Sequence, residues 1–90
     1  MSDTLQRLTG EVVVLDTGTP IVYIGRLMEV TDHTFVLDNA DMHDCRDGHA
    51  NKEEYLAEAC GGALAANRRS VVVMRSVVIS VSRLSDVIAD

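Results

Sequence analysis

Apolar segments rich in valine alternate along the chain with short clusters of threonine, glycine, proline and aspartate. The apolar runs cover residues 11–16, 21–30, 34–40, 70–75 and 77–84, and turn-forming residues separate most of them. Valine favours strands because its branched side chain packs on a pleated sheet, and the chain has thirteen Val but only one Phe and no Trp. The pattern therefore predicts five β-strands.

Two features refine this prediction at the N-terminal end. Gly25 lies inside the long second strand, where glycine is typical of a bend or a bulge. Ahead of the first strand, Ser2, Asp3 or Thr4 can cap a short helix that ends at Gly10. Five strands, a bend and tight connections favour an all-β fold, a small antiparallel barrel whose edges stay open.

Residues 41–67 break the β pattern and predict a helical insertion between the third and fourth strands. The first part of this segment is polar and acidic. Asn51 stands three residues before Glu54, which is a variant of the capping box, and apolar residues then recur at helical spacing. Since Gly61 interrupts that apolar stripe, we expect a helix that begins near Lys52 and frays at the glycines.

The size of the chain and its edges predict an assembly of identical copies. Ninety residues make one domain, 1–90, whose core is marginal in isolation. An exposed, valine-rich edge strand pairs readily with another chain, and closing a ring removes such edges. The residues expected at the subunit interface are Val71, Val72, Val73, Met74, Val77, Val78, Ile79 and Val81.

Charge is distributed unevenly. The net charge is −6, which argues against a general polyanion binder, and no DNA partner is expected. Residues 38–58 contain seven acidic side chains and two basic ones, whereas residues 59–85 contain four Arg and no acid. One face or rim can therefore be locally positive.

Neither a secretory core at the start nor an apolar run of membrane-spanning length occurs in the sequence. We expect a cytoplasmic protein that does not associate with membranes. In that compartment Cys45 and Cys60 would both be reduced.

Two segments resemble the two motifs of the Sm and Sm-like family. In residues 25–40, Gly25 and Leu27 lie in a bent strand that is followed by a polar turn and a third strand. In residues 71–79, two hydrophobic strands flank Arg75 and Ser76 at a tight turn. The resemblance implies a strongly bent open barrel of the SH3 type. It also implies a ring of six or seven copies, in which the fourth strand of one subunit pairs with the fifth of the next.

The same resemblance implies single-stranded RNA binding at the ring pore, through the turns after the second and fourth strands. The candidate residues are Asp32, His33, Thr34, Arg75 and Ser76. The Arg75 guanidinium can donate to a phosphate or a base edge, and His33 can stack on an unpaired base. The alternatives are an ion pair at Arg75, a solvated His33 and an Asx turn at Asp32.

A second interpretation stays open, a ring-forming structural or interaction module without RNA binding. The asparagine that the family carries in its first motif is absent here, and Ser76 replaces the glycine of the second motif. On the first interpretation, the acidic insertion would cover one face of the ring and restrict access to the pore.

Potential metal ligands gather in the acidic segment. A metal-dependent activity there is the third functional hypothesis, after the RNA-binding ring and the ring without RNA. Their spacing matches no known zinc or calcium loop, so a solvated loop is favoured and neither metal nor cofactor is expected. The residues concerned are Asp41, His43, Asp44, Cys45, Asp47 and His49.

Arg68 and Arg69 can follow a backbone phosphate, although we favour a pair of cations at the C-terminus of the predicted helix. The sequence contains no nucleophile motif, glycine-rich phosphate loop or paired-carboxylate signature, so we do not expect an enzyme.

Overall fold

The computed structural model describes residues 4–46 and 51–88, and within them the chain forms five strands and one α-helix. All strand pairs are antiparallel, and α1 (Lys52–Glu58) lies between the third and fourth strands, as predicted. The strands are β1 (Val12–Asp16), β2 (Ile21–Val30), β3 (Thr34–Asp44), β4 (Arg68–Met74) and β5 (Ser80–Arg83).

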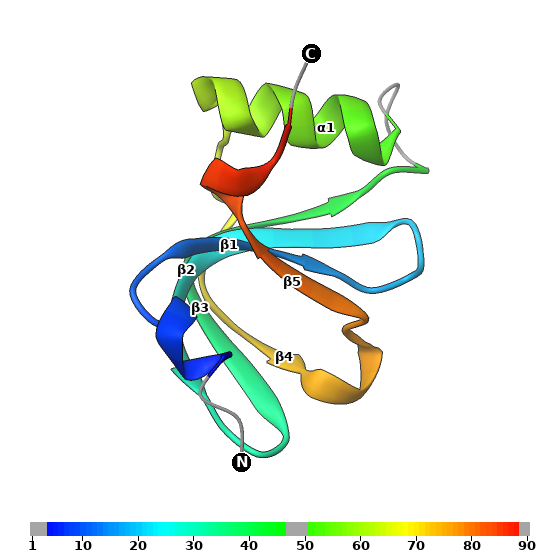
Figure 1. Cartoon of the computed structure of the whole chain (residues 1–90). Coiled ribbons are helices and arrows are strands. Elements are labelled where there is room, and N and C mark those ends of the chain that lie inside the picture. The colour runs from blue at the N-terminus through cyan, green and yellow to red at the C-terminus, as the bar shows by residue number, and fades with distance from the viewer. Residues whose placement is uncertain (1–3, 47–50, 89–90) are drawn as a thin grey trace.

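The strands form one sheet in the order β4-β3-β2-β1-β5. The sheet bends so strongly that β4 and β5 come to face each other across the open side of a barrel (Figure 1). In the part of the chain described, β4 pairs only with β3 and β5 only with β1, so each has one free edge. The predicted open barrel is therefore confirmed.

The bend in β2 requires glycine at position 25. A Cβ atom on Gly25 would lie 2.9 Å from the Cβ of Ala40 and 3.2 Å from the carbonyl oxygen of Asp38. The pairing of β2 with β3 shifts register here, between Ile24 and Arg26. Asn39, on the opposite strand, takes a left-handed conformation with a φ of 50°. The two strands thus form a bulge that lets the sheet curl.

The interior of the barrel is an apolar cluster contributed by η1, a 3-10 turn at Gln6–Leu8, and by strands β1 to β4. Its members recur at every second residue along β1 (Val13, Leu15) and the start of β3 (Phe35, Leu37), the spacing of side chains that share one face of a sheet. The buried members are Leu8, Val13, Leu15, Leu27, Phe35, Leu37, Ala40 and Val73. We call this cluster the barrel core.

A second cluster lies on the other face of the sheet, beneath α1. Its buried members are Val14, Val22, Ile24, Tyr55 and Ala59, and Leu84 and Val87 of the C-terminal segment pack against it. We call it the helix core. A full capping box begins α1: Asn51 Oδ1 accepts from the Glu54 amide, and Glu54 Oε1 accepts from the Asn51 amide.

The last helical turn, Ala59–Ala63, has π geometry, and Gly62 within it has a φ of 98°. The chain therefore leaves the helix at the glycines, as predicted.

Three boundaries differ from the prediction. β3 continues to Asp44, because Ile21–Ile24 of the long β2 remain available as pairing partners. β4 begins at Arg68, so Arg68 and Arg69 lie in a strand and not at a helix terminus. β5 is only four residues long, since Val77 belongs to a 3-10 turn, η3 (Arg75–Val77).

The predicted N-terminal helix is the single turn η1, which is preceded by Leu5. Leu5, as its N-cap residue, makes no side-chain capping bond. Ser2 and Asp3 lie outside the described residues.

Candidate nucleic-acid interface

Thr31 organises the turn between β2 and β3. Its hydroxyl oxygen accepts from the amides of His33 (3.2 Å) and Thr34 (2.9 Å) and lies 2.6 Å from the Thr34 hydroxyl. The Thr31 amide also donates to the Thr34 carbonyl at 2.9 Å. The cap of this turn is therefore a threonine and not the Asx turn considered for Asp32. Both Asp32 and His33 are exposed at its tip.

Arg75 joins this turn to the turn that follows β4. Its amide donates to the His33 carbonyl at 2.9 Å, and its Nη1 donates to the Thr31 carbonyl at 2.6 Å. Its guanidinium carbon also lies 5.4 Å from the centre of the Phe35 ring, a cation–π distance. Within the described subunit Arg75 is therefore held by carbonyls and a ring, and no ion pair forms inside its turn.

The two turns enclose a surface hollow of about 540 Å³, lined by Asp32, His33, Met74, Arg75 and Ser76. Four of the five candidate RNA-binding residues therefore lie together. The fifth, Thr34, adjoins the hollow but directs its hydroxyl to Thr31. The hollow combines an exposed imidazole, a hydroxyl, a carboxylate and a guanidinium with donors to spare, a set that can stack on a base and bond to its edge.

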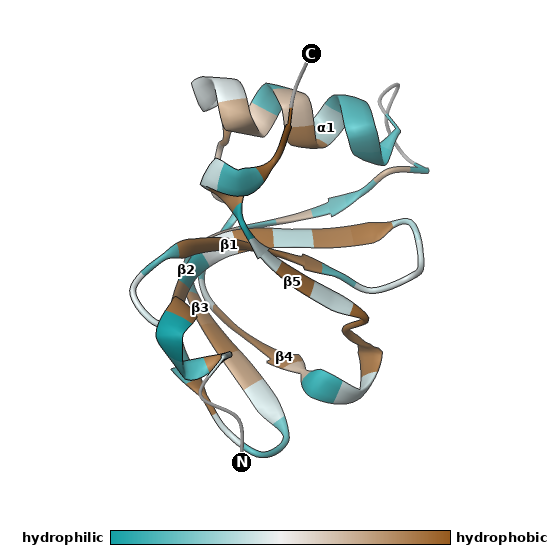
Figure 2. Cartoon of the chain, viewed as in Figure 1, coloured by the Kyte–Doolittle hydropathy of each residue, from teal (hydrophilic) through white to brown (hydrophobic). Residues whose placement is uncertain are grey.

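The predicted interface residues occupy the two free edges of the sheet. Among those on β4 and η3, Val72 is 58% exposed, Met74 56% and Val77 47%, and Ile79 just before β5 is 71% exposed. Figure 2 shows these edges in the colours of apolar residues. Val73, by contrast, is 3% exposed, so its side chain belongs to the barrel core.

Val71, Val78 and Val81 are half-buried against the barrel core. Their side chains therefore already have partners within the subunit.

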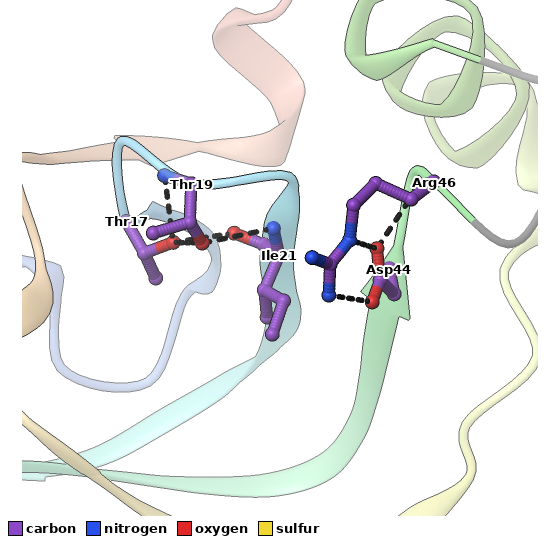
Figure 3. A network of polar contacts seen from close by, with 5 residues as sticks. All are labelled: Thr17, Thr19, Ile21, Asp44 and Arg46. Atoms are coloured by element: carbon purple, nitrogen blue, oxygen red, sulfur yellow. Dashed lines mark hydrogen bonds and ion pairs between the residues drawn. The ribbon is translucent and has the colours of Figure 1, made fainter.

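The candidate metal ligands are dispersed rather than gathered. Asp44 forms a two-pronged ion pair with Arg46, with contacts of 2.7 and 3.0 Å, beside the Thr17–Thr19–Ile21 turn (Figure 3). Arg46 lowers the pKa of the Asp44 carboxyl to about 2. Within residues 4–46 and 51–88 no three His, Cys, Asp or Glu side chains converge as a metal site would require. Asp47 and His49 lie outside the described residues.

Asp41 and His43 instead contact the helical insertion. The Tyr55 hydroxyl donates to Asp41 Oδ2 at 2.5 Å, and Asp41 is only 9% exposed. The His43 ring stacks on that of Tyr55 with centroids 4.0 Å apart. The sequence analysis missed this contact, since nothing in the local pattern relates Asp41 to a tyrosine fourteen residues later.

Sequence reasoning also missed Thr31 and Phe35, which position Arg75. The sequence does contain a signal for the role of Thr31, because Thr31 and Thr34 are spaced as in a turn that a threonine hydroxyl closes. The role of Phe35 needs the register of β3 with β4, which places Phe35 opposite Val73 and next to the Arg75 turn.

The helical insertion lies far from the hollow. Figure 1 shows α1 at one end of the molecule and the turn between β2 and β3 at the other. Within one subunit α1 therefore does not cover the hollow, and the expectation that the insertion covers one face of the ring stays a prediction. None of the helices in the described ranges has the length and apolarity needed to span a bilayer.

Comparisons with known proteins bear on the fold alone. No protein-family model matches the chain, and no curated protein matches it. Among solved structures, it is similar to an Sm protein of Pyrococcus abyssii in complex with a uridine heptamer, with 17% sequence identity and a TM-score of 0.63. The match covers 90% of this chain and 93% of that one. The chain therefore has the fold of the Sm proteins.

Proposed function

We propose that copies of this chain pair through their free β4 and β5 edges into a closed ring, and that the hollow around Arg75 binds single-stranded RNA. A ring of six or seven copies would repeat this hollow around a central pore. The function is one of binding in the cytoplasm, without catalysis. The similar Sm protein of known structure holds a uridine heptamer, which makes RNA the first ligand to test.

The observation that carries the proposal is the pair of bonds from Arg75 to the β2–β3 turn. These bonds fix two turns, distant in sequence, on either side of one hollow. One of the five guanidinium N–H groups donates to Thr31, which leaves others for a ligand. His33 is exposed beside them, and stacking on an aromatic or imidazole ring contributes about 1–3 kcal/mol per base.

The assembly step follows from the two unpaired edges. Each edge presents backbone N–H and C=O groups together with exposed Val72, Met74 or Ile79. Pairing β4 of one copy with β5 of the next would satisfy both edges at once, and only a closed ring leaves none unpaired.

A ring-forming module without RNA is the second candidate, and one observation favours it. Counted forward from Gly25, the position where the family carries asparagine is filled by Phe35, which has no polar side-chain group. Counted back from Leu37, it is filled by Thr34, whose hydroxyl already bonds to Thr31. Neither side chain is therefore free to bond to a base in the manner that the family motif implies.

Titration of labelled oligo-U and oligo-A at low and moderate salt separates these candidates. We expect wild-type protein to bind at least one of them with micromolar or tighter affinity. Arg75→Ala and His33→Ala should each weaken binding, by roughly tenfold if one stacked base or one charged bond is lost. Arg46→Ala is the matched control, because it removes an exposed arginine outside the hollow.

Two results would contradict the RNA proposal. Absence of binding at low salt, with the ring intact, would favour the interaction module. Equal losses in Arg75→Ala and Arg46→Ala would indicate a general charge effect and not a site around Arg75.

A further inference from the structure

Arg68 and Arg69 are neighbouring arginines at the start of β4, and the one hydrogen bond described for their side chains runs from Arg68 Nη1 to the Asn67 carbonyl at 3.1 Å. Arg46, Lys52 and Arg83 each form a salt bridge with a carboxylate of the same subunit. In the ranges 4–46 and 51–88, neither Arg68 nor Arg69 forms one, although both are exposed and the chain carries a net charge of −6. Two adjacent guanidinium groups thus lack an anionic partner.

The two arginines line a hollow of their own. Its other walls are Asn39, Ala66 and Asn67, so no acidic side chain borders it. On the neighbouring strand β3, Asp38 lies opposite Ser70, one residue beyond Arg69. On its other side Asp38 lies opposite Arg26 of β2.

A bulge of the backbone at Asn39 and the side-chain hydrogen bonds of Asn67 shape this hollow. Asn39 lies in it because of the left-handed bulge in β3, where its φ is 50°. Asn67 fixes the other wall, since its side chain bonds to both the amide and the carbonyl of Met42 at 3.0 Å. The hollow is therefore built on ordered backbone and not on a free loop.

We propose that Arg68 and Arg69 bind backbone phosphates of the RNA strand beyond the Arg75 hollow. This inference rests on the proposed function and extends it with a second contact to the RNA, which is made to phosphates and is independent of the base sequence. Guanidinium groups suit phosphate because their planar donors match its oxygens. Arg69 lies near the start of β4 and Arg75 follows the end of this strand, so about 20 Å separate them at a rise of roughly 3.3 Å per residue. A short oligonucleotide held at Arg75 would not reach it.

Salt dependence combined with RNA length tests this site. The variants are Arg69→Gln, Arg69→Lys, which keeps the charge, and Arg46→Gln, which removes one charge elsewhere. Each is titrated with oligo-U of about four and about fifteen nucleotides, the range of single-stranded binding sites, at several salt concentrations. For the long RNA we expect Arg69→Gln to weaken binding about threefold to fivefold. The slope of log K against log salt should become shallower by about 0.7.

For the short RNA, Arg69→Gln should behave as wild type, and Arg69→Lys should keep the wild-type slope with both lengths. Arg68→Gln/Arg69→Gln should reduce the slope for the long RNA by about 1.4, twice the single change. Arg46→Gln should leave the slope unchanged.

Three results would overturn the inference, and each has a different consequence for the proposed function. Wild-type behaviour of Arg69→Gln on long RNA, with Arg75→Ala still defective, would remove the second contact and leave the proposed function intact. No RNA binding by the wild type would remove both. An altered subunit number for Arg68→Gln/Arg69→Gln in native mass spectrometry, with short and long RNA affected alike, would assign the arginines to a neighbouring subunit.

Discussion

The two faces of the bent sheet are packed in different ways. The barrel core is apolar throughout, and apart from Leu8 of η1 its buried members come from strands that neighbour one another in the sheet. The helix core instead joins β1 and β2 to the helical insertion and the C-terminal segment. Polar contacts also hold it: Tyr55 to Asp41, and Lys52 to Asp16 at 2.6 Å.

The stability of the two clusters on this sheet therefore depends on different interactions. Apolar burial is indifferent to pH, whereas a buried phenol–carboxylate bond depends on the ionisation of its partners. We therefore expect the helix core to open without the barrel core, and the barrel core not to open alone.

The largest effect should come from the barrel core. Leu27 is fully buried there, and Leu27→Ala should lower the free energy of unfolding by about 3–4 kcal/mol through lost burial and the cavity left behind. Chemical denaturation, followed with separate probes of the β-sheet and of α1, should show that the two structures unfold at the same denaturant concentration. Ile88→Ala, at an 88% exposed position, is the control and should change stability little. Loss of the helix signal alone in Leu27→Ala would reverse the proposed hierarchy.

A smaller effect is expected at the junction of the two cores. Gly25→Ala places a methyl group 2.9 Å from the Cβ and 3.0 Å from the Cα of Ala40, and should cost about 2 kcal/mol by overpacking. Gly61→Ala is matched to it, because nothing lies within 4 Å of a Cβ at that position. Thermal denaturation of both variants measures the contrast. Equal melting temperatures would show that β2 relaxes its bend without cost.

The smallest effect should be confined to the helix core. Tyr55→Phe removes the only hydrogen bond described for the buried Asp41 carboxylate and should cost about 1 kcal/mol. Hydrogen exchange should reveal faster exchange in α1 while the strands of the barrel core stay protected. Uniformly faster exchange over the whole chain would contradict separate opening of the helix core.

The same contact predicts a dependence on alkaline pH. Burial, and then the bond to Asp41, raise the pKa of Tyr55 above its ordinary value of 10.0. A raised pKa means that the contribution to stability is complete below pH 10 and is lost as the pH rises further. The free energy of unfolding should therefore fall more steeply above pH 10 in the wild type than in Tyr55→Phe, as measured by chemical denaturation of both proteins over that pH range.

The sequence predicts the barrel core and the helix core to different extents. Valine-rich runs separated by turn residues, together with the glycine at position 25, were sufficient to predict the open barrel, because these signals are local and a Cβ at position 25 would meet Ala40. The convergence of His33 and Arg75 on one hollow was expected only through a family resemblance. The contacts of Tyr55 with Asp41 and His43 were not predictable, since they depend on where an insertion folds back onto the sheet.

The boundary at Asp44 was missed for a related reason. Polar residues 41–44 look like a loop, but β2 supplies pairing partners for them as far as Ile21. Strand pairing is a property of the partner strand as much as of the strand itself, and the polar pattern conceals it.

The central claim is that two free edges of one sheet pair between copies. Native mass spectrometry of the purified chain over a range of concentrations, with and without oligo-U, tests it most directly. We predict a single closed assembly of six or seven subunits that gains the mass of RNA when oligo-U is added. A stable monomer at the highest concentration in dilute buffer would contradict the account.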